Sequence, residues 1–176
     1  MNTKTTRNKS GELAALRDFF SYNTFVRKKY LRLICKLPEK TVKKDRGASY
    51  PSILDIFTHA LDVIRSWPHA YETGEDLPEL KGLSIEKLRK EENRVDAYLE
   101  TFMRKLKPED LGKSFSFTPG NGKRILTLNT GEMLWHCVEE ELQHRGELNA
   151  LLWQDDIDPP VTDWFSWKEA VRKKTR

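Results

Sequence analysis

The sequence predicts an all-α protein, a four-helix bundle with a small β-hairpin before the last helix. Four segments repeat apolar side chains at three- and four-residue spacing, which is the period of an amphipathic helix. One later segment, SFSFTPGNGKRILTL, instead alternates apolar and polar residues around a Pro-Gly-Asn-Gly turn. Amphipathic helices bury their apolar faces against one another, so four of them predict a bundle.

The first two predicted helices are bounded by prolines. The first covers 10–37, and the charged segment 38–50 that follows it is expected to be a loop. Pro51 suits the first turn of the second helix, and Pro68 is expected to end it. His59 lies at the margin of the apolar face of this second helix.

The third helix follows an irregular connection. Residues 69–83 contain glycines and a proline, so they are expected to be irregular, with His69 as a loop residue. Ser84 is a suitable N-cap for the third helix, whose outer face is dense in charged side chains. Pro108 follows the end of this helix.

The hairpin is predicted as an insertion between helices and not as a second domain. Phe115 and Phe117 alternate with serines, and Pro119–Gly122 supply the turn. Either Asn129 or Thr130 can cap the helix that follows the second strand.

The last helix, Gly131–Trp153, carries polar residues where the fold requires apolar ones. Glu140, Glu141 and His144 fall inside the same stripe as its leucines and methionine. A carboxylate in a core is costly unless it is paired, protonated or bound to a metal. We therefore interpret this stripe as a functional site.

A short aromatic segment follows the last helix. Aspartates and prolines at 155–160 end that helix. Trp164, Phe165 and Trp167 then lie close together, and we expect them to pack back on the bundle or against a second subunit.

The amino-acid composition indicates the class of protein. Of the 176 residues, 38% are hydrophobic and 33% charged, which is typical of one globular domain. We expect a domain at 10–168, a disordered basic tail at 1–9 and a basic C-terminal tail at 169–176. Two cysteines and the lack of an apolar run of ~20 residues or of a signal peptide favour a cytoplasmic protein without a membrane span. The net charge of +4 comes largely from the tails, so nucleic-acid binding is not expected.

Helical spacing predicts a metal site. Glu140 and His144 are four residues apart, so both side chains can reach one ion. A third ligand must come from a facing helix, and His59 is the other histidine on a helix with a well-defined buried face. The hypothesis is one divalent metal held by His59, Glu140 and His144, with water in the remaining positions.

Several alternatives stay open at this point. Glu141 competes with Glu140 for the ligand role, and His136 is either an outer hydrogen-bond donor or an alternative ligand. Cys137 is either a soft ligand or a buried core residue. Glu141 and His144 form one ExxH pair, whereas ferritin-like di-iron bundles need two, so a dinuclear site of that type is not expected.

The ordered set of motifs resembles the DinB-like superfamily over about residues 12–167. The segments that carry the resemblance are FFSYNTFVRKKYL, LPEKTVKKDRGASYPSILDIFTHALDVIRSW, SFSFTPGNGKRILTL and HCVEEELQHRGELNALLW. The resemblance implies an up-down-down-up bundle, usually dimeric, with three histidine ligands. Carried over, these are His59, position 140 and His144; position 140 is Glu140 here, where the family commonly has histidine.

The resemblance also implies a function. Family members with known activity include thiol-dependent transferases and isomerases. We therefore expect a small-molecule substrate, a low-molecular-weight thiol cosubstrate and one zinc, nickel, iron or manganese ion that activates the thiol or water, in a transferase or hydrolase. Glu141 and His136 are then candidate bases, Arg145 is a candidate anion contact, and Glu147 replaces the usual glutamine of the signature. The alternative is a non-catalytic, dimeric stress-response or binding protein with a structural or decayed metal site.

Overall fold

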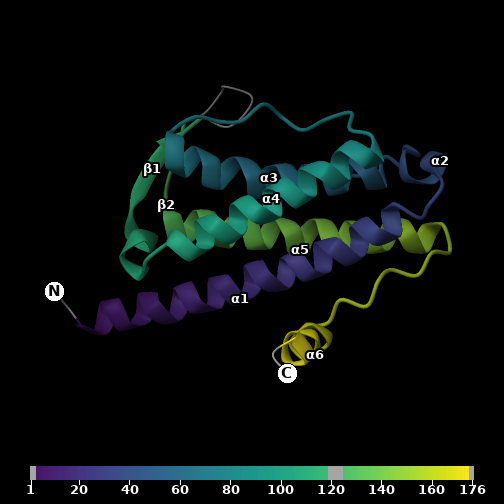
Figure 1. Cartoon of the computed structure of the whole chain (residues 1–176). Helices are drawn as coiled ribbons and strands as arrows, with labels where there is room; N and C mark the ends of the chain where they lie inside the picture. Colours follow the sequence, from purple (N-terminus) through teal and green to yellow (C-terminus); the bar gives the residue numbers. More distant parts are fainter. Residues whose placement is uncertain (1–2, 119–124, 175–176) are drawn as a thin grey trace.

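Four long helices lie side by side along a common direction (Figure 1). The computed structural model describes residues 3–118 and 125–174. The predicted four-helix bundle is confirmed. Its long helices are α1 (Thr3–Ile34), α3 (Ile53–Thr73), α4 (Ile85–Lys105) and α5 (Thr130–Gln154). The short helices are α2 (Glu39–Val42), the 3-10 helix η1 (Pro108–Gly112) and α6 (Trp164–Lys174).

The helix directions follow the up-down-down-up order that the family resemblance implies. α3 returns antiparallel to α1, and the connection at 74–84 then runs back along the length of the bundle (Figure 1). α4 therefore points the same way as α3, and α5 points the same way as α1. This order places α5 against both α1 and α3, the two helices that meet its polar side chains.

The predicted hairpin is present before α5. Strands β1 (Ser114–Phe117) and β2 (Leu126–Asn129) pair antiparallel, and the predicted turn Pro119–Gly122 lies outside the described residues. Asn129, one of the two predicted caps, accepts a hydrogen bond from the Glu132 amide at 2.9 Å. The Glu132 carboxylate accepts one from the Asn129 amide at 2.7 Å, which completes a capping box.

Helix α3 is longer than predicted at one end and shorter at the other. It begins at Ile53, because Ser52 is the N-cap and accepts from the Asp55 amide at 3.2 Å, so Pro51 lies outside the helix and not in its first turn as predicted. It also continues through Pro68 to Thr73, which makes the prediction of a stop at Pro68 wrong. Proline removes one backbone donor, but this proline is buried, and packing of the flanking turns holds the helix. His69 is consequently a helical residue and not a loop residue.

The ends of the chain also contain more helix than predicted. α1 begins at Thr3, so the expected loose tail at 1–9 is wrong from that residue onward. α6 reaches Lys174 and includes most of the predicted basic tail at 169–176. Apolar periodicity is a weak signal in such charged segments, because their sequences contain few apolar residues.

The aromatic segment packs back on the bundle. Trp164 lies 5.3 Å from Phe19 and 5.0 Å from Tyr22 between ring centroids, and Trp167 lies 5.9 Å from Tyr22. Phe165, the third aromatic, remains 81% exposed. α6 therefore covers α1 with two of its three aromatic side chains.

None of the helices within the described ranges has the length and apolar character needed to cross a membrane.

A buried arginine ties three of the long helices together. Arg27 of α1 is 5% exposed and contacts Glu141 of α5 and both Glu92 and Asp96 of α4. Burial acts to lower the pKa of Arg27, but these three carboxylates outweigh it and raise that pKa. Burial first, then the neighbouring Asp96, raises the pKa of Glu92 to about 7 against the opposing effect of Arg27, so Glu92 holds a proton more readily than an ordinary glutamate.

Replacing Arg27 should destabilise the whole bundle. In Arg27→Met, three buried carboxylates lose their shared cation, and we expect the free energy of unfolding to fall by about 3–5 kcal/mol. Urea denaturation followed by circular dichroism measures this change. Arg32→Met, at an exposed arginine of the same helix, is the matched control and should change stability by about 0.5 kcal/mol or less. Equal effects of the two substitutions would contradict the structural role of Arg27.

Glu92 should make stability fall as pH rises. Its folded pKa lies above the ordinary value of 4.5, so the folded state holds the proton more tightly than the unfolded state. The resulting stabilisation is present below pH 4.5 and is lost as the pH rises through about 7. Glu92→Gln should therefore lose less stability between pH 5 and pH 8 than the wild type, as measured by urea denaturation across that range. Glu100→Gln, at an exposed glutamate of the same helix, should follow the wild-type profile.

Candidate metal centre

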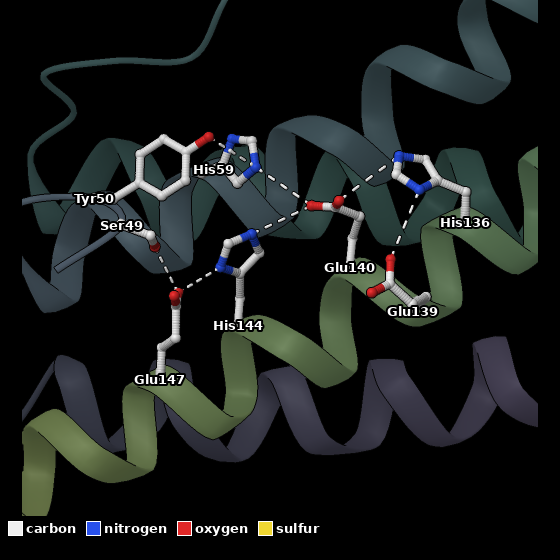
Figure 2. A network of polar contacts seen from close by, with 8 residues as sticks. All are labelled: Ser49, Tyr50, His59, His136, Glu139, Glu140, His144 and Glu147. Carbon is white, nitrogen blue, oxygen red and sulfur yellow. Dashed lines mark hydrogen bonds and ion pairs between the residues drawn. The ribbon is translucent and has the colours of Figure 1, made fainter.

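Helix α5 presents two polar stripes to two different neighbours. Glu141, Arg145 and Asn149, each four residues apart, face α1 and hydrogen-bond to Arg27, to Tyr22 and Asn23, and to Tyr30 respectively. The second stripe, His136, Glu140 and His144, faces α3 (Figure 2). Neighbouring residues on a helix point about 100° apart, which is why adjacent glutamates reach different helices.

The three predicted ligands meet at one carboxylate oxygen. Oε2 of Glu140 lies 3.4 Å from Nε2 of His59 and 3.2 Å from Nε2 of His144 (Figure 2). His59 comes from α3, and its ring centroid lies 4.8 Å from that of His144. One ligand atom from each of the three residues lies within 4.8 Å of the other two. The structure thus brings together Glu140, and not Glu141, with the two histidines.

The donor set suits a divalent transition metal. Metal–ligand bonds of about 2.0–2.2 Å place neighbouring ligand atoms roughly 3.0–3.5 Å apart. The two separations from Glu140 Oε2 to the histidine nitrogens fall in this range. Two imidazoles and one carboxylate are ligands for zinc, iron, nickel or manganese, and three protein ligands leave positions open for water or substrate.

Glu147 fixes the orientation of His144. Nδ1 of His144 lies 2.7 Å from Oε2 of Glu147, and the Ser49 hydroxyl donates to the same carboxylate oxygen at 2.7 Å. Burial acts to raise the pKa of Glu147, but the hydrogen bonds from Ser49 and His144 outweigh it and lower that pKa. An ionised Glu147 accepts the Nδ1 proton, so the lone pair of Nε2 is directed at Glu140 and at the position a metal would take.

Tyr50 packs against His59, the histidine that α3 contributes. Its ring stacks on His59 with centroids 4.0 Å apart, and its hydroxyl lies 3.0 Å from Nε2 of His59. Burial first, then the charge of Glu140, raises the pKa of the Tyr50 phenol, so the phenol keeps its proton. Burial, and next the neighbouring His144, lowers the pKa of His59 and favours the neutral imidazole that binds metals. Metal binding at Nε2 of His59 would therefore require the Tyr50 hydroxyl to move away from that nitrogen.

A comparison with protein-family models identifies the family of this chain. The model of the DinB family matches residues 1–175. The chain belongs to the DinB family. A comparison with curated proteins finds no match. As a DinB-family protein, the chain departs from the expected histidine at position 140, and the structure shows that Glu140 still points at His59 and His144.

Two residues that the sequence analysis proposed for the metal centre of this DinB-family protein lie on another face of α5. Glu141 pairs with buried Arg27, and Arg145 donates to Tyr22 Oη and Asn23 Oδ1, both at 2.8 Å. The predictions of Glu141 as a base and of Arg145 as an anion contact therefore do not fit the structure, because both side chains are engaged on the α1 face.

The structure also shows where Cys137 and His136, the other two candidates on α5, lie. Cys137 is fully buried with its sulfur near Met133, which favours the core interpretation over that of a ligand. His136 lies on the far side of the Glu140 carboxylate, with Nε2 3.7 Å from Oε1.

Sequence reasoning missed two residues of the centre. Glu147 was noted only as a departure from the family signature, although its i+3 spacing from His144 was a usable signal. Tyr50 precedes Pro51 in the predicted loop, and nothing in the local pattern points to its contact with His59. Tyr50 also borders space for a ligand, because Tyr50 and His59 line a cavity of about 190 Å³ between α3 and the connection at 74–84.

Removing the Glu147 carboxylate should weaken metal binding without removing a ligand. In Glu147→Leu, His144 loses the acceptor that fixes its tautomer, and we expect the dissociation constant for zinc to rise about 10–100-fold. A competition titration against a chromophoric chelator measures this constant. Glu147→Gln keeps an acceptor oxygen and is the matched control, with a smaller expected change. If Leu and Gln gave the same affinity as the wild type, Glu147 would have no orienting role.

Proposed function

We propose that this DinB-family protein is a metal-dependent enzyme in which His59, Glu140 and His144 hold one divalent ion. The observation that carries the proposal is the convergence of two imidazole nitrogens, from α3 and α5, on one carboxylate oxygen. A packing role for these residues would leave a carboxylate without a basic partner in a largely enclosed position, which is costly. A cation supplies that partner.

The proposed reaction class is transfer or hydrolysis on a small molecule. The bound ion would act as a Lewis acid and lower the pKa of a thiol or a water molecule. Glu147 would hold His144 in its ligating tautomer, and Tyr50 would hold a proton beside the open positions. The cavity of about 190 Å³ next to His59 gives a small substrate, or a low-molecular-weight thiol, room to approach. With Glu141 paired to Arg27, Tyr50 and His136 are the proposed proton-holding groups.

A second candidate function is a non-catalytic, dimeric binding protein with a structural or decayed metal site. The observation that favours it is the set of large apolar side chains exposed around the end of α5 and the start of α6. These are Trp153, Val161 and Phe165. For either function, we propose a homodimer that covers these side chains. We also propose a cytoplasmic location, because Cys35 and Cys137 are free cysteines.

Metal content tests the proposed centre directly. Protein purified without an affinity tag should contain close to one tightly bound divalent ion per chain, measured by inductively coupled plasma mass spectrometry. His144→Ala should lose it, because it removes a ligand and the Glu147-oriented imidazole together. His69→Ala, at a histidine of α3 outside the centre, is the matched control and should keep the metal.

The outcome also separates the two functions. A wild type without metal, and without uptake of zinc, nickel, iron or manganese, would overturn the metalloenzyme proposal. Tightly bound metal together with turnover in a screen of thiol-transfer and hydrolysis substrates, lost in His144→Ala, would favour the enzyme over the binding protein. Circular dichroism spectra of the variants confirm that any loss is not due to unfolding.

A further inference from the structure

A small cavity of about 30 Å³ lies between α1, α3 and α5. Apolar side chains from all three helices form part of its wall. The polar part of the wall includes two residues of α1, Asn23 and Arg27, and two residues of α5, Glu141 and Arg145. Within the described part of the chain, this cavity shares no lining residue with the space beside His59, so it is separate from the space proposed for a substrate.

The side-chain amide of Asn23 carries a buried donor. Asn23 is 1% exposed, and its Oδ1 accepts a hydrogen bond from Arg145 at 2.8 Å. This bond identifies the oxygen end of the amide, because an amide NH2 group cannot accept from a guanidinium. The other end, Nδ2, has no hydrogen-bond acceptor among the described residues. A buried donor is costly unless another group accepts its hydrogen bond, so Nδ2 requires a partner.

Glu141 presents an acceptor to the same cavity from the opposite helix. It is 8% exposed, and its contact with Arg27 runs through Oε1. A carboxylate has about four lone-pair sites on its two oxygens, so Glu141 can accept further hydrogen bonds through Oε2. Because Asn23 and Glu141 line one small cavity, a molecule between them can accept from the amide and donate to the carboxylate.

Size and charge determine which molecule fits. A cavity holds a water molecule once its volume exceeds roughly 10–15 Å³, so a volume of about 30 Å³ has room for water and not for an organic molecule. The charge of Glu141 disfavours an anion, and the guanidinium groups of Arg27 and Arg145 disfavour a cation. A neutral molecule of this size that both donates and accepts hydrogen bonds is water.

We propose that one ordered water molecule binds in this cavity, accepting a hydrogen bond from Nδ2 of Asn23 and donating one to Oε2 of Glu141. The inference goes beyond the proposed function, because neither partner is a proposed metal ligand. The same two residues make the direct contacts between α1 and α5, Glu141 with Arg27 and Asn23 with Arg145. The water therefore adds a third link between these helices and restrains the side chains that orient α5.

The proposal makes the cavity favour a polar replacement over an apolar one. Ala60 of α3 lines the cavity and is 8% exposed. Valine and threonine have nearly the same shape and similar helix propensities, so either would take up the same space at position 60. Only threonine supplies a hydroxyl that can replace the hydrogen bonds of the water. A dry apolar cavity would instead favour valine.

Nuclear magnetic resonance of the full chain tests for the water directly. The side-chain amide protons of Asn23 should show cross-peaks to water with opposite signs in nuclear Overhauser and rotating-frame spectra, which is the signature of a long-lived bound water. Those of Asn93, an exposed asparagine of α4, are the control and should show only short-lived contact with solvent. Ala60→Val should lose the Asn23 cross-peaks. A wild type without long-lived water at Asn23 overturns the proposal.

Urea denaturation tests whether the cavity requires hydrogen bonds. Ala60→Thr should have a higher midpoint than Ala60→Val, because the threonine hydroxyl can take the place of the water. Ala97 of α4 is exposed, so Ala97→Thr and Ala97→Val are the matched controls and should have equal midpoints. An equal or higher midpoint for Ala60→Val than for Ala60→Thr would contradict the proposal. If neither variant at position 60 folds, the wild-type spectra decide the outcome.

Discussion

The rotation of α5 about its axis is set by one buried interaction, the contact of Arg27 with Glu141. This pair fixes Glu141 toward α1, and Arg145 adds a second anchor one turn later on the same face. The next residue around the helix, Glu140, must then point toward α3 and His59. The candidate centre thus depends on an ion pair that does not belong to it, because a different rotation would bring the wrong glutamate to the histidines.

The buried charges of the bundle fall into two classes with different consequences. Around Arg27, the guanidinium, a proton on Glu92 and the ammonium of Lys28 beside Asp96 compensate the three carboxylates, and this cluster needs no ligand. Around Glu140, the partners are histidines, and a neutral imidazole cannot offset a carboxylate. The difference separates the residues that stabilise the bundle from those that remain available to bind a cation. It also argues against the centre being only a hydrogen-bonded network of the core.

The architecture was predictable where the period of the apolar side chains and the capping residues indicated the same helix or strand. The four long helices, the hairpin and the Asn129 cap follow directly from the sequence. Local rules failed where tertiary packing outweighed them. Pro68 is a strong stop signal, yet α3 continues because its flanking turns are packed on both sides. The start of α1 at Thr3 escaped detection because a charged segment carries no apolar period.

The ligand set was predictable only in part, since one helix cannot decide between neighbouring glutamates. Glu140 and Glu141 both border the apolar stripe, and the choice is made by Arg27 on another helix, which no spacing within α5 reveals. The same limit hid Tyr50, whose contact with His59 depends on the path of the 38–50 segment. Once Glu140 is known to face the histidines, its replacement of the family's histidine need not mark a decayed site. A carboxylate there keeps a donor oxygen directed at both His59 and His144.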